Sequence, residues 1–357
     1  MTVRLRSALD GLPSYAPGRN VPGAVKLASN ELSFPTLPSV AEAIGAHAAQ
    51  GATGGLNRYP DNAANLLAEQ LAALAGAPRE NLVVGGGSVA LCHQIAEITV
   101  DRGDEVIYGW RSFETYPIVT GLMGGRAMQI PVTAAQELDL AAMADAVTDR
   151  TRLIFVCTPN NPTGTAVRTD QLTTLLDAVP EDVLVVVDEA YREFDRDPES
   201  PNGVQLALTR PNVLALRTLS KAYGLAGLRV GYAVGPLDVV TALRRVAIPF
   251  AVNSLAQVAA LAALEHGAEF VPRWEQVVAE RDRVSIALRG FGFEVPPSQA
   301  NFVWLPLAEE ATRFAAHCET HRVIVRPFAD AAGGVRVSIG SPEENDQFLA
   351  AAGSYPG

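Results

Sequence analysis

Between about residues 82 and 235 the chain alternates short apolar runs with segments in which apolar residues recur at helical spacing. The apolar runs predict strands at 82–85, 105–108, 126–132, 152–157, 183–188, 213–217 and 229–234, and residues 88–100 predict a helix between the first two. Residues 152–157 and 183–188 are almost continuously apolar, which is typical of parallel strands buried on both faces. The pattern therefore predicts an α/β fold with a mostly parallel, doubly wound sheet.

The two ends of the chain have a different pattern. Residues 1–45 are rich in Pro and Gly, and from residue 246 a long helical pattern leads to predicted strands at 301–305, 323–326 and 335–339. We expect both ends to fold together as a small α+β domain. The predicted boundaries are 46–245 for the large domain, and 1–45 with 246–357 for the small one.

Composition narrows the possible partners and compartment. The 357 residues carry a net charge of -11, which argues against nucleic acid or an anionic membrane as a partner. No apolar run approaches the ~20 residues that span a bilayer. The three cysteines are far apart and form no CxxC pair, which predicts a cytoplasmic protein. His317 and His321 have helical spacing without suitable partner ligands, so a solvated helix face is expected and no metal site is predicted.

Lys221 follows the predicted strand 213–217 and stands between small residues. Burying a lysine is unfavourable unless its charge is used or removed, and a neutral amine can form a Schiff base with an aldehyde. Ser220 and Arg229 nearby are good phosphate binders, so the aldehyde could carry a phosphate, as pyridoxal phosphate does. The alternative is an ordinary surface lysine at a strand end.

Ligands of doubly wound sheets bind beyond the carboxyl ends of the strands, where further candidates stand. Asp188 could hold a pyridine nitrogen protonated, which makes the ring an electron sink, or it could simply cap the next helix. Tyr191 could reach the ring's phenolic oxygen. Asn161 lies in a turn made rigid by two prolines and Gly164, and could reach the same oxygen.

Residues 85–90, Gly-Gly-Gly-Ser-Val-Ala, follow the first strand and open a helix. Free backbone N–H groups and the helix dipole favour an anion there. The segment also fits the dinucleotide fingerprint, but that fingerprint expects an acid at the end of the second strand, where Gly109 and Trp110 stand. Phosphate binding is the interpretation that remains.

Aromatic and basic residues offer further contacts. Phe113 and Tyr116 follow the second strand, and either could stack on a flat ring or pack in the core. Arg336 could bind a carboxylate through two hydrogen bonds. Arg326 could face the same site, and for both arginines the alternative is a surface ion pair.

Together these motifs resemble those of the fold-type I pyridoxal-phosphate aminotransferases over nearly the whole chain. The residues that carry this resemblance are Asn161-Pro162-Thr163-Gly164, Asp188-Glu189-Ala190-Tyr191, Ser220-Lys221 and Arg229. The chain is most similar to the histidinol-phosphate aminotransferase branch and its aromatic relatives, through Asn57-Arg58-Tyr59-Pro60, Ser298-Gln299-Ala300-Asn301-Phe302 and Gly333-Gly334-Val335-Arg336.

The resemblance implies a cofactor, a partner and a set of roles. Pyridoxal 5'-phosphate is the implied cofactor, and Lys221, Asp188 and Tyr191 are the implied catalytic residues. The implied cofactor contacts are Gly87, Ser88, Val89, Phe113, Asn161, Asp188, Tyr191, Thr218, Ser220, Lys221, Arg229 and, from a neighbouring subunit, Tyr59. The implied substrate contacts are Arg336 to the α-carboxylate, with Arg326, Asn161, Tyr15 and Asn30. A homodimer with shared active sites follows from the role of Tyr59.

Two departures from the histidinol-phosphate pattern bear on the substrate. Val89-Ala90 stands where many of those enzymes have Asp-Glu, and residues 29–34 replace their Asn-Glu-Asn-Pro. Both changes make the region more apolar and resemble the actinobacterial aromatic amino acid (phenylalanine) aminotransferases. Tyr15, Leu32, Phe34 and Phe113 are the predicted apolar walls.

The expected activity is therefore transfer of an amino group from an aromatic amino acid to 2-oxoglutarate, giving an aromatic 2-oxo acid and glutamate. Histidinol-phosphate transamination is the alternative, because the position of Arg326 resembles one that meets substrate phosphate. A non-catalytic sensor is disfavoured, since the chain carries no basic extension. A lyase or decarboxylase on the same scaffold stays open.

Overall fold

The computed structural model describes residues 3–9, 11–12, 18–51, 55–330 and 332–356. Its strands are β1 Val25–Lys26, β2 Leu82–Gly85, β3 Glu105–Trp110, β4 Arg126–Pro131, β5 Thr151–Cys157, β6 Leu184–Asp188, β7 Val213–Thr218, β8 Gly231–Val234, β9 Phe302–Leu305, β10 Val323–Ile324, β11 Arg326–Phe328 and β12 Gly334–Ser338. Its α-helices are α1 Pro38–Ala48, α2 Asn65–Ala75, α3 Ser88–Thr99, α4 Thr115–Met123, α5 Leu140–Asp145, α6 Thr169–Ala178, α7 Gly203–Thr209, α8 Leu237–Val246, α9 Ser254–Glu265, α10 Val271–Gly290, α11 Ala311–Thr320 and α12 Pro342–Gly353.

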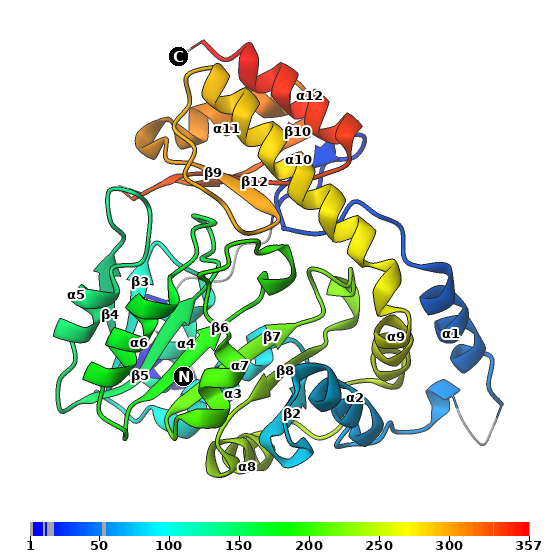
Figure 1. Cartoon of the computed structure of the whole chain (residues 1–357), viewed down its shortest axis with the longest axis vertical. Coiled ribbons are helices and arrows are strands. Elements are labelled where there is room, and N and C mark those ends of the chain that lie inside the picture. Colours follow the sequence, from blue (N-terminus) through cyan, green and yellow to red (C-terminus); the bar gives the residue numbers. More distant parts are fainter. Residues whose placement is uncertain (1–2, 10, 13–17, 52–54, 331, 357) are drawn as a thin grey trace.

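A seven-stranded sheet with the order β2-β8-β7-β6-β5-β3-β4 forms the centre of the larger part (Figure 1). Strand β8 is antiparallel to β2 and β7, and the other neighbours are parallel. Helices cover both faces of the sheet. The predicted α/β class with a mostly parallel, doubly wound sheet is therefore confirmed.

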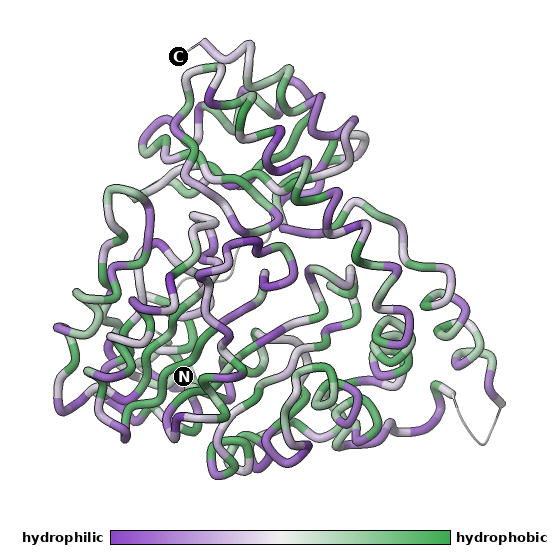
Figure 2. The backbone as a smooth tube through the Cα atoms, viewed as in Figure 1, coloured by the Kyte–Doolittle hydropathy of each residue, from purple (hydrophilic) through white to green (hydrophobic). Residues whose placement is uncertain are grey.

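Alternation along the central strands explains why they are almost continuously apolar. In β5, Ile154 and Val156 belong to one hydrophobic core, whereas Leu153 and Phe155 belong to the core on the other face. Each face of the sheet thus buries its own layer, as expected of parallel strands covered on both sides. In Figure 2 these strands are largely hydrophobic, while hydrophilic segments lie toward the outside.

The smaller part of the molecule draws on both chain ends. Strands β9, β11 and β12 form an antiparallel sheet, and β1 pairs with β10 in parallel. The backbone N–H of Leu27 donates to Ile324 at 2.8 Å, and the N–H of Ser338 donates to Leu27 at 2.9 Å. In Figure 1 these strands lie with α10, α11 and α12 above the central sheet. The residue boundaries of the two domains stay a prediction.

The structure differs from the predicted strands at two places near the site. The predicted strand 323–326 is split at Val325, because β10 pairs with β1 whereas β11 pairs with β12. Strand β8 begins at Gly231 and not at Arg229, whose φ of 61° is incompatible with an extended strand. Arg229, at the second interruption, lines the cavity described below.

No helix in the described part of the chain is both long and apolar enough to cross a membrane.

Candidate active site

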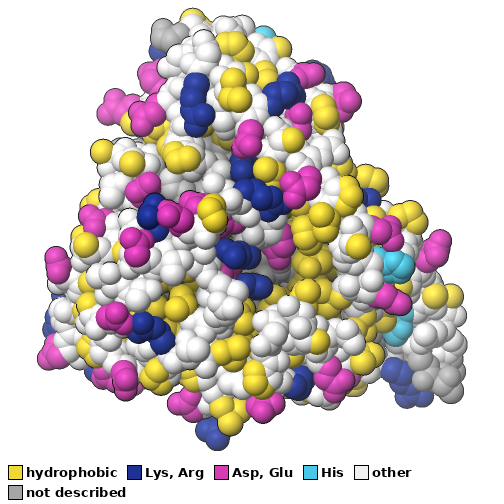
Figure 3. All heavy atoms as spheres, viewed as in Figure 1, with side chains coloured by type: hydrophobic (Ala, Val, Ile, Leu, Met, Phe, Trp, Pro, Cys, Tyr) yellow, Lys and Arg dark blue, Asp and Glu magenta, His cyan; other side chains and the backbone are white. Residues whose placement is uncertain are grey.

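A cavity of about 460 Å³ lies at the carboxyl ends of the central strands, next to the smaller part of the molecule. Among the residues that line it are Asn30, Ser88, Val89, Phe113, Asn161, Asp188, Tyr191, Thr218, Ser220, Lys221, Arg229 and Arg336. In Figure 3 basic side chains gather around a hollow near the middle of the face shown. The structure therefore brings most of the predicted site residues to one cavity.

Lys221 follows β7 and reaches the cavity with its amine. Its Nζ donates a hydrogen bond of 3.2 Å to the carbonyl of Ser29. Burial, together with the positive charges of Arg336 and Arg229, lowers the pKa of Lys221 to about 7. A lysine with this pKa is largely neutral at slightly alkaline pH, which is the form that attacks an aldehyde.

Asp188, at the end of β6, is only 2% exposed. Its Oδ2 accepts a hydrogen bond of 2.8 Å from the hydroxyl of Tyr116, while its Oδ1 has no partner among the described residues. Burial raises the pKa of Asp188 to about 6. An unpartnered buried oxygen is unfavourable unless a ligand supplies a donor, so this atom fits a protonated ring nitrogen.

Tyr191 is connected to the N-terminal segment through Asn30. The Nδ2 of Asn30 donates to the Tyr191 hydroxyl at 2.9 Å. Asn30 is itself held by its backbone N–H on the Ser338 hydroxyl at 2.8 Å, and by its carbonyl, which accepts from Asn301 at 3.1 Å. Burial raises the pKa of Tyr191, so its hydroxyl stays protonated and can donate.

The turn at Gly87 and the start of α3 form a cradle for an anion. Gly87 has a φ of 90°, and a Cβ placed there would come 2.4 Å from a terminal nitrogen of Arg229. The same guanidinium donates to the Ser220 hydroxyl at 3.3 Å. Ser88 occupies the first turn of α3, where N–H groups lack helical partners. A phosphate group fits this combination.

Asn161 and Arg336 contact each other across the cavity. The Nη1 of Arg336 donates to Oδ1 of Asn161 at 2.6 Å, and its Nη2 donates to the carbonyl of Ala28 at 2.8 Å. Arg336 is buried, so a carboxylate that reaches it gains a strong interaction in a dry environment.

Arg326 and Tyr59 lie elsewhere. Arg326 is not among the described residues that line the cavity; it forms an ion pair of 3.0 Å with Glu114, which does line it. Tyr59 is 82% exposed and stacks on Phe250. Its predicted role in a neighbouring subunit stays a prediction.

The predicted apolar walls are only partly at the cavity. Phe113 lines it, whereas Tyr15 lies outside the described residues. Leu32 and Phe34 line a separate small pocket, where the Phe34 ring lies 5.4 Å from the Arg273 guanidinium. Neither side chain is among the described residues that line the cavity, and their contact with substrate stays a prediction.

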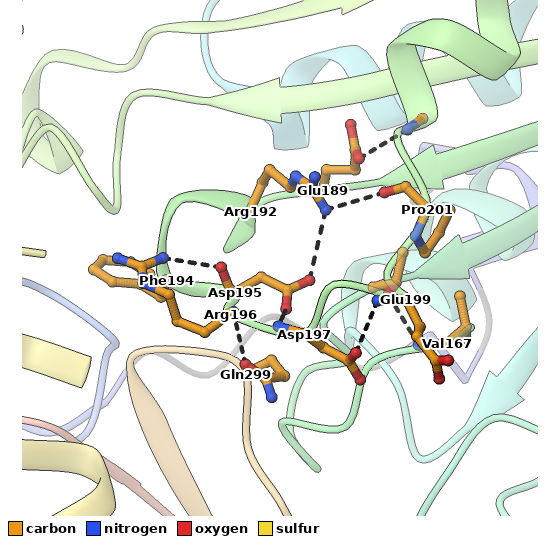
Figure 4. Close-up of polar contacts among 12 residues, drawn as sticks. Val167, Glu189, Arg192, Phe194, Asp195, Arg196, Asp197, Glu199, Pro201 and Gln299 are labelled. Carbon is orange, nitrogen blue, oxygen red and sulfur yellow. Dashed lines mark hydrogen bonds and ion pairs between the residues drawn. The ribbon is translucent and has the colours of Figure 1, made fainter. Parts of the chain in front are cut away.

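The loop after Tyr191 is fixed by its own polar contacts (Figure 4). Glu189 accepts from the N–H of Gly203 at 2.9 Å and from Arg217 at 2.9 Å. Further along, Arg192 donates to the carbonyl of Pro201 at 3.1 Å, and the N–H of Arg196 donates to Gln299 at 2.9 Å. These bonds hold the segment that carries Asp188 and Tyr191.

For two residues at the site, Tyr116 and Glu114, the sequence did not predict the position that the structure shows. Tyr116 binds Asp188, although its sequence context allowed only stacking or core packing. Glu114 stands next to Phe113 on the cavity wall. A polar residue beside a predicted stacking residue was the one available signal for Glu114.

The cavity fits the cofactor expected from the sequence. It combines a lysine of lowered pKa, a buried carboxylate with one oxygen available, and an anion cradle. Within the described residues no group of three or more His, Cys, Asp or Glu side chains gathers as a metal site would require.

Comparison with known proteins gives a consistent family. The sequence model of the family "Aminotransferase class I and II" matches residues 22–351. The aromatic amino acid aminotransferase of Mycolicibacterium paratuberculosis is 54% identical over 98% of this chain and 97% of that protein. Those of Thermobifida fusca and Streptomyces coelicolor are 54% and 53% identical, over 99% and 97% of this chain and 97% and 96% of those proteins.

Solved structures agree with the fold. The histidinol-phosphate aminotransferase of Sinorhizobium meliloti in complex with pyridoxal-5'-phosphate superposes with a TM-score of 0.89 at 27% identity, covering 99% of this chain and 97% of that one. The aspartate aminotransferase of Thermus thermophilus with maleate has a TM-score of 0.83 at 26% identity, covering 98% and 99%.

Proposed function

The chain belongs to the class I and II aminotransferases, and from that premise we propose that it transfers the amino group of an aromatic amino acid to 2-oxoglutarate with pyridoxal 5'-phosphate as its cofactor. One observation supports this class of reaction most directly. Lys221 and Asp188, whose Oδ1 has no partner, line the same cavity. The names of relatives above 50% identity support the aromatic donor.

Each residue of the site has a role that follows from its chemistry. The bound cofactor supplies an electron sink for the electrons of the substrate's Cα–H bond. Asp188 holds a proton on the ring nitrogen, and the neutral Lys221 amine accepts and returns the α-proton. Tyr191 and Asn161 offer hydrogen bonds to the phenolic oxygen. Arg336 orients the substrate through its α-carboxylate, while Ser88, Ser220 and Arg229 bind the phosphate.

The cavity wall favours an aromatic side chain over a phosphorylated one. Val89, Phe113 and Ile118 present apolar surface to the cavity, which suits a benzene or indole ring. A phosphate requires cations, and Arg326 is already paired with Glu114. Histidinol phosphate is therefore the weaker candidate. The non-catalytic sensor lacks an observation in its favour, because the full set of reactive groups is present.

A homodimer is the proposed assembly. Tyr59, stacked on Phe250, is joined by exposed Leu56 and Ile248 in the same two segments of the chain, and exposed apolar groups of this kind suit an interface. Mixing inactive Tyr59→Ala dimers with inactive Lys221→Ala dimers, under conditions in which subunits exchange, should restore activity if the active sites are shared. If mixed dimers are detected but activity does not return, the sites are not shared.

Three buried cysteines that form no disulfide support a cytoplasmic location.

Two measurements test the activity. Borohydride reduction followed by peptide mass analysis should place the cofactor on Lys221, and Lys221→Ala, which removes the amine, should lose both the adduct and transamination. Steady-state rates with 2-oxoglutarate should be higher for phenylalanine than for histidinol phosphate, with one glutamate formed per 2-oxo acid. A lyase or decarboxylase would break that ratio, and the reverse preference would overturn the aromatic donor.

A further inference from the structure

Glu189 carries a buried carboxylate to which the reaction described above gives no role. Its side chain is 1% exposed, and its Oε1 accepts from the N–H of Gly203 at 2.9 Å (Figure 4). Its Oε2 accepts from Nε of Arg217 at 2.9 Å and lies 2.9 Å from Nη2 of the same guanidinium. A buried ion pair contributes little net stability, because both charges have lost their hydration. Stability alone is therefore a poor account of this pair.

The pair lies on the face of the central sheet that is turned away from Asp188. Asp188 is the direct strand partner of Leu216, which belongs to one hydrophobic core, whereas Val187 belongs to the core on the other face. The strand pairing continues to Glu189, whose N–H donates to the carbonyl of Leu216 at 2.8 Å. Because side chains alternate along a strand, Glu189 shares the face of Val187. Neither Glu189 nor Arg217 is among the described residues that line the cavity, so the pair acts on the site through the backbone.

Three segments that supply reactive side chains are joined at Glu189. Strand β6 ends at Asp188, and strand β7 leads to Lys221. The loop from Glu189 to Gly203 carries Tyr191, and the hydrogen bond between its two end residues closes it. A Cβ at Gly203 would stand 2.9 Å from Oε2 of Glu189, so this close approach requires glycine. One carboxylate therefore links the backbone of Asp188, Tyr191 and Lys221, the three catalytic side chains.

We propose that Glu189 is a positioning residue that acts from the face of the sheet opposite the cavity. By binding Arg217 and Gly203 at once, it fixes how far apart the three catalytic side chains stand around the cofactor. Such spacing matters because a misplacement of about 1 Å can lower a rate by about a hundredfold. The proposal rests on the proposed function, since it assumes that the three side chains act on one bound cofactor.

A neutral double variant, Glu189→Gln with Arg217→Met, separates positioning from stability. The glutamine oxygen can still accept from Gly203, and neither member of the pair is left as an unpaired buried charge, so the free energy of unfolding should stay near the wild-type value. The link from the loop to β7 is lost. We therefore expect kcat with phenylalanine and 2-oxoglutarate to fall by at least about tenfold, and the Kd for pyridoxal phosphate to rise by about tenfold. KM should change less, because Arg336 is untouched.

Gly203→Ala is the second variant, and it displaces the Glu189 carboxylate without removing a charge. It should lower kcat and raise the cofactor Kd in the same direction. If the double variant does not fold, this single substitution decides the test.

Glu105→Gln with Arg150→Met is the matched control. Glu105 is also 1% exposed and accepts from Arg150 at 3.0 Å, but it stands at the start of β3, at the opposite end of the sheet from the cavity. This variant should leave kcat and the cofactor Kd unchanged. If the Glu189 variants keep the wild-type kcat and Kd, or if the control lowers kcat as much as they do, the positioning role is overturned. A wild-type protein whose cofactor Kd responds to the Glu189 variants as expected, but which does not transaminate phenylalanine, would overturn the proposed function alone.

Discussion

The Tyr116 hydroxyl donates a 2.8 Å hydrogen bond to one oxygen of Asp188 and leaves the other oxygen for a ligand. Tyr116 is fully buried, and its ring stacks on Phe155 with centroids 4.3 Å apart. The carboxylate is thereby held by a side chain that is itself buried and packed against a second ring. Because a buried acceptor with fixed geometry binds a donor without further ordering, Tyr116 is a positioning residue for Asp188.

Tyr116→Phe should therefore weaken cofactor binding while preserving the fold. The ring still stacks on Phe155, but Oδ2 of Asp188 loses the hydrogen bond from the Tyr116 hydroxyl, which raises the pKa of Asp188 further and weakens its hold on the ring nitrogen. We expect the cofactor Kd to rise by about tenfold, the effect of one hydrogen bond to a charged group. Tyr108→Phe is the control, because the Tyr108 hydroxyl contacts Gln129 and not Asp188. Equal Kd values for the two variants would contradict the positioning role.

Gly87→Ala should damage the anion cradle. The new Cβ would meet Arg229 at 2.4 Å, and a φ of 90° is strained for any residue with a side chain. We expect the Kd for pyridoxal phosphate to rise by at least about tenfold, because Arg229 must move away from Ser220. Gly86→Ala is the matched substitution one residue earlier, where the nearest atom would be 3.5 Å away, and it should leave the Kd nearly unchanged.

The pH dependence of cofactor capture should report Lys221. Its amine must be neutral to attack an aldehyde, and its pKa is about 7, so the neutral fraction rises with pH through 7 and then levels off. Stopped-flow absorbance of cofactor-free protein mixed with pyridoxal phosphate should show a rate that is almost constant from pH 8 to 10. A rate that keeps rising to pH 10 would mean that the lysine has its ordinary pKa.

Asp188→Asn should stabilise the cofactor-free protein. The folded-state pKa of Asp188 is raised to about 6, so its contribution to stability is full below its unfolded pKa and is lost as the pH rises through 6. Asparagine does not ionise, so the variant avoids this loss of stability. The free energy of unfolding at pH 7.5 should therefore increase by up to about 3 kcal/mol. Denaturant unfolding at pH 5 and 7.5 measures this, and the gain should be smaller at pH 5. With the cofactor bound, the wild type should be the more stable protein.

Local pattern was enough to predict the sheet and the residues at its edge. Each central strand alternates between two buried faces, so its apolar run is visible in the sequence. A polar residue at or just after the end of a strand, such as Asp188 or Lys221, then lies at the carboxyl edge as a consequence of topology.

Contacts between distant segments could not be read in the same way. Glu114 and Arg326 are 212 positions apart, and nothing periodic connects them, so Arg326 was expected to face the substrate and its partner was not foreseen. Phe113 and Tyr116 look alike as aromatic residues after a strand. Only the packing of α4 decides that one ring lines the cavity while the hydroxyl of the other reaches Asp188.

The bond between Asn30 and Ser338 joins residues 308 positions apart, and it has a consequence for synthesis on the ribosome. Strands β6 and β7, which position Asp188 and Lys221, leave the ribosome well before β12, so the central sheet can form early, as domains do during translation. Asn30 has its anchor for Tyr191 only after the last strand has emerged. The pocket is thus completed at the end of translation, and a chain truncated before β12 would lack both Arg336 and the anchored Asn30.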